Sequence, residues 1–172
     1  NKIVIATSKN LEDDIIFEFC KSKKISVFRG HPDNLLKRYY DCAKFYGAKN
    51  IVRITSDCPL MDHRLIDKMI DNYSKFKNID YYSNVHPPTL PDGFDIEIFN
   101  FKVLKKSYFN AKKKYEKEHV TPYIWDNPKL FNTLNYGLKN FFSKFEFKLW
   151  IKTFFFFYFF ICCQRYYNFS KF

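Results

Sequence analysis

Asp57 stands at a position where a carboxylate could do chemistry. It follows a run of mostly β-branched residues, 51–55, which predicts a buried β-strand. The strand must end before Pro59, because proline lacks a backbone N–H and disfavours helical backbone in the preceding residue. Open α/β folds bind ligands beyond the carboxyl ends of their strands, where a carboxylate can hold Mg²⁺ against nucleotide phosphates. The spacing is equally compatible with Asp57 merely capping the next helix.

A second acidic segment follows a loop with three prolines and the turn-forming pair Asp92-Gly93. Residues 94–99 alternate between apolar and acidic types, which predicts a half-buried strand with Asp95 and Glu97 together on its open face. Such a pair suits the binding of hydroxyl groups or of a metal, whereas the alternative is a plain solvent-facing strand. The preceding loop favours binding, since binding residues concentrate on loops.

One histidine is a candidate acid or base. His119 has Glu118 beside it and a tyrosine four residues away on either side. Histidine changes its charge near neutral pH. A lone histidine is nevertheless more often structural, and the sequence by itself favours that interpretation.

Strands and helices alternate through residue 85, which predicts an α/β fold. Strands separated by helices of about ten to fifteen residues form a mostly parallel sheet, with helices on both faces. Asp33 or Asn34 is expected to begin the helix that Gly47 ends. The expected strands are 2–7, 25–28, 50–55, 79–85, 94–99 and 131–136; the expected helices are 10–24, 34–46, 63–76 and 101–114, with a short helix or turn at 116–125.

The chain is basic, with 29 Lys and Arg against 18 Asp and Glu and a net charge of +11. A basic module that binds nucleic acid or a membrane surface is therefore an alternative. The basic residues are scattered and mostly lysine, within a composition typical of A/T-rich codons, so no specific nucleic-acid role is predicted. Five cysteines without a C-x-x-C pair or a secretory signal indicate neither disulfides nor zinc, and favour a cytoplasmic location.

The composition changes at Phe141. Residues 154–163 form an unbroken run of ten aromatic or apolar residues, whereas a membrane-spanning helix needs about 20. We predict no membrane span, and expect residues 141–172 to be an aromatic-rich tail that is frameshifted or disordered.

Eight separated blocks together resemble the spore coat polysaccharide cytidylyltransferase family, which is similar to the CMP-KDO and CMP-sialate synthetases. The resemblance covers residues 2–136, and the agreement of all the blocks makes it specific. It implies a nucleotide-diphosphosugar-transferase-like (Rossmann-like) fold. The blocks are Ile-Val-Ile-Ala-Thr-Ser (3–8), Glu-Asp-Asp (12–14), Val-Phe-Arg-Gly (27–30), Arg-Tyr-Tyr (38–40), Val-Arg-Ile-Thr-Ser-Asp-Cys-Pro-Leu (52–60), Tyr-Tyr-Ser-Asn (81–84), Pro-Asp-Gly-Phe-Asp-Ile-Glu (91–97) and Glu-His-Val-Thr-Pro-Tyr-Ile (118–124).

The resemblance further implies transfer of CMP from CTP to a sugar or sugar acid for surface polysaccharide synthesis, with Mg²⁺ and release of pyrophosphate. In the matching blocks, Asp57 would hold Mg²⁺ and Arg53 would support the acidic loop. The implied nucleotide-binding residues are Arg29, Gly30 and Arg38. The implied sugar-binding residues are Asp92, Asp95 and Glu97, with Glu118 and His119 near the acceptor.

The sequence also departs from the family pattern. Members begin with a strand and a basic, glycine-containing loop that binds the triphosphate, and this chain starts at Asn1 without them. We therefore expect residues 1–140 to form an incomplete nucleotidyltransferase-like domain. A glycosyltransferase that uses a nucleotide sugar is an alternative, disfavoured because no D-x-D motif directly follows a strand. The sequence leaves open which sugar is activated, whether the truncated chain is active and whether it forms a homodimer.

Overall fold

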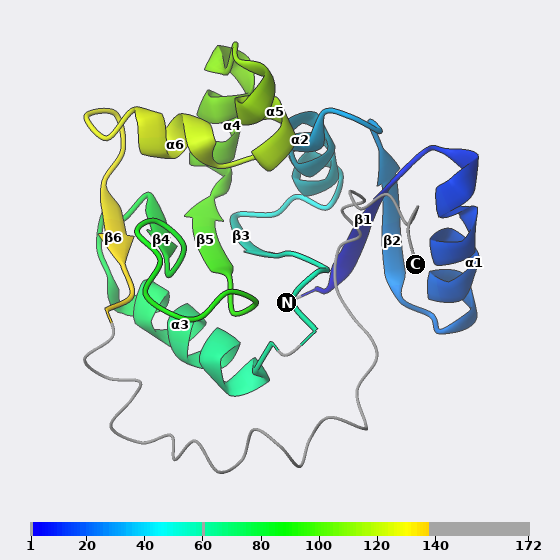
Figure 1. Ribbon diagram of the computed structural model, residues 1–172, viewed down its shortest axis with the longest axis horizontal. Coiled ribbons are helices and arrows are strands. Elements are labelled where there is room, and N and C mark those ends of the chain that lie inside the picture. Colours follow the sequence, from blue (N-terminus) through cyan, green and yellow to red (C-terminus); the bar gives the residue numbers. More distant parts are fainter. Residues whose placement is uncertain (1, 60, 138–172) are drawn as a thin grey trace, which may run out of the picture.

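The computed structural model describes residues 2–59 and 61–137 and has an α/β architecture (Figure 1). The strands are β1 (Val4–Ser8), β2 (Ser26–Gly30), β3 (Asn50–Ile54), β4 (Tyr81–Ser83), β5 (Ile96–Asn100) and β6 (Thr133–Asn135). The helices are α1 (Asp14–Ser22), α2 (Leu35–Phe45), α3 (His63–Lys75), α4 (Phe101–Asn110), α5 (Lys114–His119) and α6 (Pro122–Asp126), with a 3-10 helix at Leu11–Asp13.

The described strands form two hydrogen-bonded sheets. β1 and β2 pair in parallel, and the second sheet has the order β3-β5-β4-β6. In that sheet β4 and β6 are parallel, while β5 is antiparallel to both β3 and β4. Three of its four strands therefore run in one direction, but β5 is inserted between β3 and β4 in the opposite direction, so the sheet is mixed.

The central position of β5 corrects the prediction of a half-buried strand with an open face. Ile96, Glu97, Ile98 and Phe99 are each at most 1% exposed. The alternation still separates two faces: Ile96 and Ile98 pack with residues of α3, and Phe99 packs with residues of α2 and α4. Glu97 shares the face of Phe99, and this face is covered at Glu97.

The ends of α2 follow from local sequence signals. The side chain of Asn34 accepts a hydrogen bond from the backbone N–H of Lys37 at 2.8 Å, which confirms the predicted cap. Gly47 ends the helix with φ of +63°, a left-handed conformation that costs glycine little. Both ends of α2 are where the sequence predicted them, because each depends only on residues a few positions away.

The predicted tail, 141–172, lies outside the described residues, and so does its apolar run. Within residues 2–59 and 61–137, no helix is long and apolar enough to cross a membrane.

Replacing Gly47 with alanine tests the origin of the α2 terminus. We expect Gly47→Ala to lower the free energy of unfolding by about 1 kcal/mol, because a Cβ atom makes the positive φ unfavourable. Urea unfolding measures this change. Gly137→Ala is the matched control, since a Cβ atom there meets open space and the backbone lies outside the left-handed region. Equal effects of the two substitutions would contradict the explanation.

Candidate functional site

Three aspartates lie where β3 ends and β5 begins; we call Asp57, Asp92 and Asp95 the acidic rim. The two strands pair antiparallel with Ile54 opposite Ile96, so the end of β3 meets the start of β5. Asp57 is exposed in the segment after β3, and the half-buried Asp95 directly precedes β5. The sheet therefore brings together carboxylates from two segments that are far apart in the sequence.

The charges of the acidic rim interact. Burial raises the pKa of the Asp95 carboxyl above its usual range, and the negative charges of Asp92, Glu97 and Asp57 raise it further. The positive charge of Arg53 acts in the opposite direction and lowers this pKa. The rim thus concentrates negative charge next to one buried cation.

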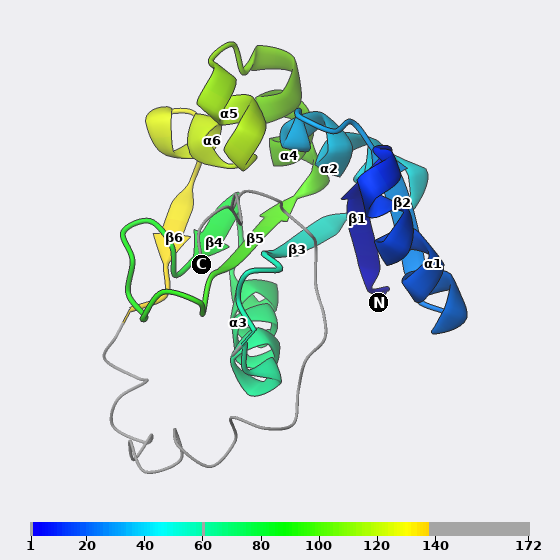
Figure 2. The same cartoon turned by 45° about the vertical axis from the view of Figure 1, so that its right-hand side comes forward.

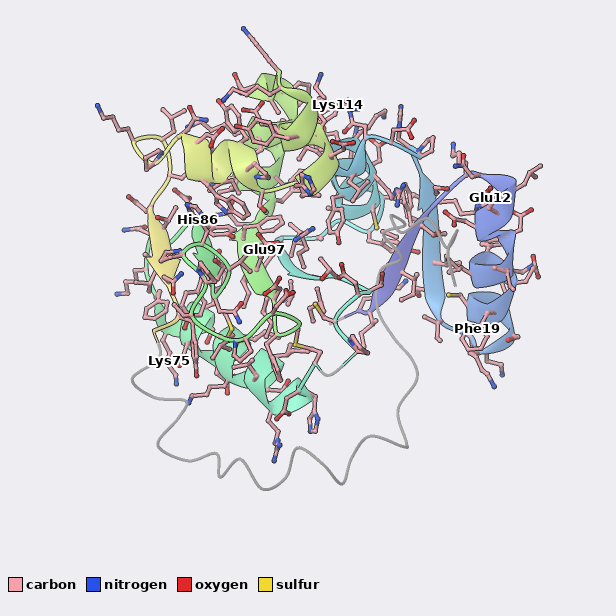
Figure 3. All side chains as sticks on the ribbon, viewed as in Figure 1. Glu12, Phe19, Lys75, His86, Glu97 and Lys114 are labelled. Carbon is pink, nitrogen blue, oxygen red and sulfur yellow. The ribbon has the colours of Figure 1, made fainter. Side chains whose placement is uncertain are left out.

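Arg53 and Glu97 form a buried ion pair beside the rim. They lie opposite each other in β3 and β5, and Nη1 of Arg53 donates a hydrogen bond to Oε2 of Glu97. The Tyr81 hydroxyl donates to the other oxygen, Oε1, at 2.7 Å. Figure 3 labels Glu97 on the ribbon of β5, among the side chains of the sheet. The predicted open placement of Glu97 is therefore wrong: both its oxygens bind groups of the protein itself.

Cys58 joins the two segments of the rim. Its thiol is 6% exposed and lies 3.0 Å from the Thr55 hydroxyl oxygen. Burial raises the pKa of the thiol, a hydrogen bond to the backbone of Asp95 lowers it, and the charges of Asp57 and Asp95 raise it. The group is therefore a neutral thiol at neutral pH, and it lies between the turn that carries Asp57 and the start of β5.

The predicted nucleotide-binding residues form a separate group at the carboxyl ends of β1 and β2. The guanidinium of Arg29 donates to the carbonyl oxygens of Ser8 and Asn10, each at 2.9 Å, and forms an ion pair with Asp14 at 2.6 Å. Arg29 thus ties the end of β1 to the start of α1.

Arg38 has a similar role in the turn before α2. Its side chain is 3% exposed and donates to the carbonyl oxygens of His31 at 2.9 Å and Pro32 at 2.6 Å. A Cβ atom on Gly30 would lie 2.6 Å from Cγ of Arg38, so glycine permits this close packing. The contacts described for this group are with β1, α1 and the loop before α2. The two arginines bind backbone carbonyl oxygens in these segments.

Glu118 and His119 lie away from the acidic rim. Both are at the end of α5, where His119 is exposed and Glu118 is half-buried. α5 packs against α2 and α6, and both cartoon views place it at the opposite end of the four-stranded sheet from α3, the helix that Asp57 precedes (Figures 1 and 2). The predicted role of both residues near an acceptor stays a prediction that these contacts do not test.

Two side chains beside the site were not predicted from the sequence. Tyr81 and Trp125 lie in β4 and α6, and the Trp125 indole N–H donates to the Tyr81 hydroxyl oxygen at 2.9 Å. Buried tyrosine and tryptophan side chains usually find hydrogen-bond partners. That tendency marks both as candidates for a polar network, but it does not identify Glu97 as the partner.

The acidic rim fits the way in which proteins bind Mg²⁺ together with a nucleotide. In the part of the chain that the structure describes, no group of three His, Cys, Asp or Glu side chains is arranged as a metal site. Mg²⁺ commonly uses one or two carboxylates and completes its shell with water and phosphate oxygens. Asp57 is exposed at the rim, and a cation there would relieve the repulsion that raises the pKa of Asp95.

Comparison with known proteins identifies the family. The family model described as Cytidylyltransferase matches residues 1–164. The chain belongs to the cytidylyltransferase family. This result confirms the relationship that the sequence blocks indicated.

Two relatives of this cytidylyltransferase-family chain match about three quarters of it. A Methanocaldococcus jannaschii protein described as uncharacterized, MJ1063, is 45% identical over 129 residues, which are 75% of this chain and 51% of that protein. The spore coat polysaccharide biosynthesis protein SpsF of Bacillus subtilis is 32% identical over 133 residues, 76% of this chain and 53% of SpsF. The chain thus spans about half the length of the curated relatives it matches.

A solved structure confirms the fold. The cytidylyltransferase from Leptospira borgpetersenii is 37% identical, with a TM-score of 0.74 over 78% of this chain and 57% of that chain. The nucleotide-diphosphosugar-transferase-like α/β fold is therefore confirmed.

Removing one member of the buried ion pair should be costly. We expect Arg53→Met to lower the free energy of unfolding by about 3 kcal/mol, because the Glu97 carboxylate is left buried without its cation. Lys21→Met breaks an exposed pair with Glu18 and serves as the control, with an expected change within about 0.5 kcal/mol. Urea unfolding of both variants compares them. A small effect of Arg53→Met would show that the pair is not a structural constraint.

The electrostatic coupling of the rim is directly measurable. We expect Asp92→Asn to lower the pKa of Asp95, since it removes the neighbouring carboxylate that raises this pKa most. The ¹³Cγ chemical shift of Asp95, followed against pH, reports the change. Asp71→Asn, an exposed position on α3, is the control and should leave the titration as it is. An unchanged curve in Asp92→Asn would mean that the two carboxylates are not coupled.

Proposed function

We propose that the chain is the nucleotide-binding part of a CTP-dependent nucleotidyltransferase, which transfers CMP from CTP to a sugar or sugar acid and releases pyrophosphate. The observation that carries this proposal is that Asp57, after β3, and Asp95, before β5, are brought to the same edge of the sheet and interact electrostatically, in a chain of the cytidylyltransferase family. The relationship to SpsF, a protein named for spore coat polysaccharide biosynthesis, supports surface polysaccharide as the destination of the sugar.

Each residue of the acidic rim then has a role. Asp57, which is exposed, holds Mg²⁺, and the bound ion neutralises negative charge on the triphosphate. Asp95 and Asp92 accept hydrogen bonds from hydroxyl groups of the sugar. Catalysis of phosphoryl and nucleotidyl transfer depends mainly on such positioning and charge neutralisation.

Arg53 supplies the positive charge of the site. Its guanidinium is held by Glu97, and its charge opposes the rise in the pKa of Asp95 that burial and the neighbouring carboxylates cause. Arg29, Gly30 and Arg38 contribute to the nucleotide side of the site through the turns that they hold in place. Family membership favours CMP transfer over a nucleotide-sugar-dependent glycosyltransferase.

Nucleotide binding by the chain tests this proposal. We expect CTP to bind in the presence of Mg²⁺, and chelation of the metal to weaken binding. Asp57→Asn should weaken binding at least about tenfold, because a metal-binding carboxylate is lost. Calorimetric titration measures the affinities, and Asp71→Asn is the control, with unchanged affinity expected.

Two outcomes would contradict the proposal. One is the absence of CTP binding with Mg²⁺, and the other is binding that is the same in Asp57→Asn and without the metal. Where CTP binds, incubation with candidate sugar acids and analysis for a CMP-sugar and pyrophosphate identifies the acceptor. A glycoside as the product would favour the glycosyltransferase alternative.

A further inference from the structure

A row of polar side chains crosses the four-stranded sheet just inside the acidic rim. Arg53 is paired with Glu97, Glu97 with Ser83, and Ser83 with Asn135 in the registers of the neighbouring strands. Residues directly opposite each other in a sheet present their side chains on the same face. Three of these residues are at most 8% exposed. The row thus places Arg53 inside the protein and opposite Glu97, which follows Asp95 by two residues.

A chain of hydrogen bonds leads from this row to α6. Trp125 Nε1 donates to the Tyr81 hydroxyl oxygen at 2.9 Å, and that hydroxyl donates to Glu97 Oε1 at 2.7 Å. Glu97 Oε2 accepts from Arg53. An indole nitrogen can only donate and an ionised carboxylate can only accept, so each hydrogen bond in this series has only one possible direction of donation.

The burial of these hydrogen-bonded side chains holds them in one arrangement. Tyr81 and Glu97 are each 1% exposed, so water does not compete for their hydrogen bonds. Burial, together with the charge of Glu97, raises the pKa of Tyr81 well above its ordinary value, which keeps the hydroxyl available as a donor. A carboxylate with one fixed donor on each oxygen has a fixed orientation, and the Arg53 guanidinium that it binds is fixed with it.

Trp125, the first donor in this series of hydrogen bonds, also contacts the proline-containing loop. The His86 ring stacks on the Trp125 ring, with 4.7 Å between ring centroids and 4° between planes. His86 begins the segment that continues to Asp92 and Asp95. One face of Trp125 therefore contacts the loop that carries part of the acidic rim, while its N–H contacts the network that holds Arg53.

We propose that Tyr81 and Trp125 are positioning residues, which act through Glu97 to fix the Arg53 guanidinium beside the acidic rim. Neither side chain touches the substrate in this proposal. Its consequence for catalysis rests on the proposed function, whereas the coupling between Trp125 and Arg53 is a property of the protein without ligand. The two statements can therefore be tested separately.

The coupling is tested by NMR of the Arg53 side chain in the ligand-free chain. Trp125→Phe keeps an aromatic ring against His86 and removes only the N–H donor. We expect it to shift the guanidinium signals of Arg53 and to accelerate rotation about its Nε–Cζ bond by about fivefold, the factor that corresponds to one lost hydrogen bond. Tyr81→Phe should have an effect at least as large.

A neighbouring tyrosine provides the matched control. Tyr82 is 3% exposed and lies in β4 next to Tyr81, but it packs with α3 on the opposite face, where Asn72 donates to its hydroxyl at 3.4 Å. Tyr82→Phe should leave the Arg53 signals unchanged. If Trp125→Phe and Tyr81→Phe leave them equally unchanged, the proposal is overturned.

A double substitution tests whether Trp125 and Tyr81 act on Arg53 through the same series of hydrogen bonds. Residues in one hydrogen-bond network are non-additive, so Trp125→Phe should add little once Tyr81→Phe has removed the connecting hydroxyl. Full additivity of the two effects on Arg53 would contradict the proposal. Thermal unfolding in parallel separates positioning from stability, since a merely structural role lowers the melting temperature without moving the Arg53 signals of the folded protein.

With CTP, Mg²⁺ and an acceptor, Trp125→Phe should lower kcat by about fivefold with little change in KM, because the orientation of Arg53 matters mainly in the transition state. An unchanged kcat together with shifted Arg53 signals would overturn the catalytic part of the proposal. If no variant and no unsubstituted chain binds CTP, the proposed function fails, and the NMR comparison still decides whether Trp125 and Tyr81 position Arg53.

Discussion

The four-stranded sheet depends on one buried charge pair. Burial of two charges is costly unless they are paired and hydrogen-bonded, and Arg53 and Glu97 satisfy this condition only when they lie opposite each other in β3 and β5. A slip of one residue would turn one side chain to the other face and leave both charges without partners. The pair therefore fixes the register of β5 against β3, and this register brings Asp57 and Asp95 to the same edge of the sheet.

The same type of group serves two purposes in this fold. Arg29 and Arg38 use their guanidinium groups to hold carbonyl oxygens of tight turns, which gives the ends of β1 and β2 their shape. Arg53 is held by a carboxylate instead, and its charge reaches the acidic rim. Positive charge near the site is thus buried and oriented, whereas the negative charge of Asp57 and Asp92 is exposed and available to a cation.

Where the prediction succeeded, the signals were local. The β-branched run before Asp57, the Asn34 cap and the glycine that ends α2 each depend on residues close in the sequence, and the structure contains the strand, the cap and the positive-φ glycine. The strand is not buried along its whole length as predicted, because β3 is an outer strand of the described sheet and Val52 is 37% exposed. The alternation within β5 correctly separated Glu97 and Phe99 from Ile96 and Ile98. The same alternation suggested an open face, because it reports which side chains point the same way and not what covers them.

The sequence by itself determined the order of strands and helices, the family, and the carboxylates that could serve a nucleotide-binding site. Only the tertiary structure decided that β5 is central and antiparallel, that Glu97 binds Arg53 and Tyr81, and that Trp125 extends this network to α6. The physical reason is distance along the chain: Arg53 and Glu97 are 44 residues apart, as are Tyr81 and Trp125. Hydrogen bonds between such residues leave no periodic pattern in the sequence, because they depend on which strands become neighbours when the core is buried.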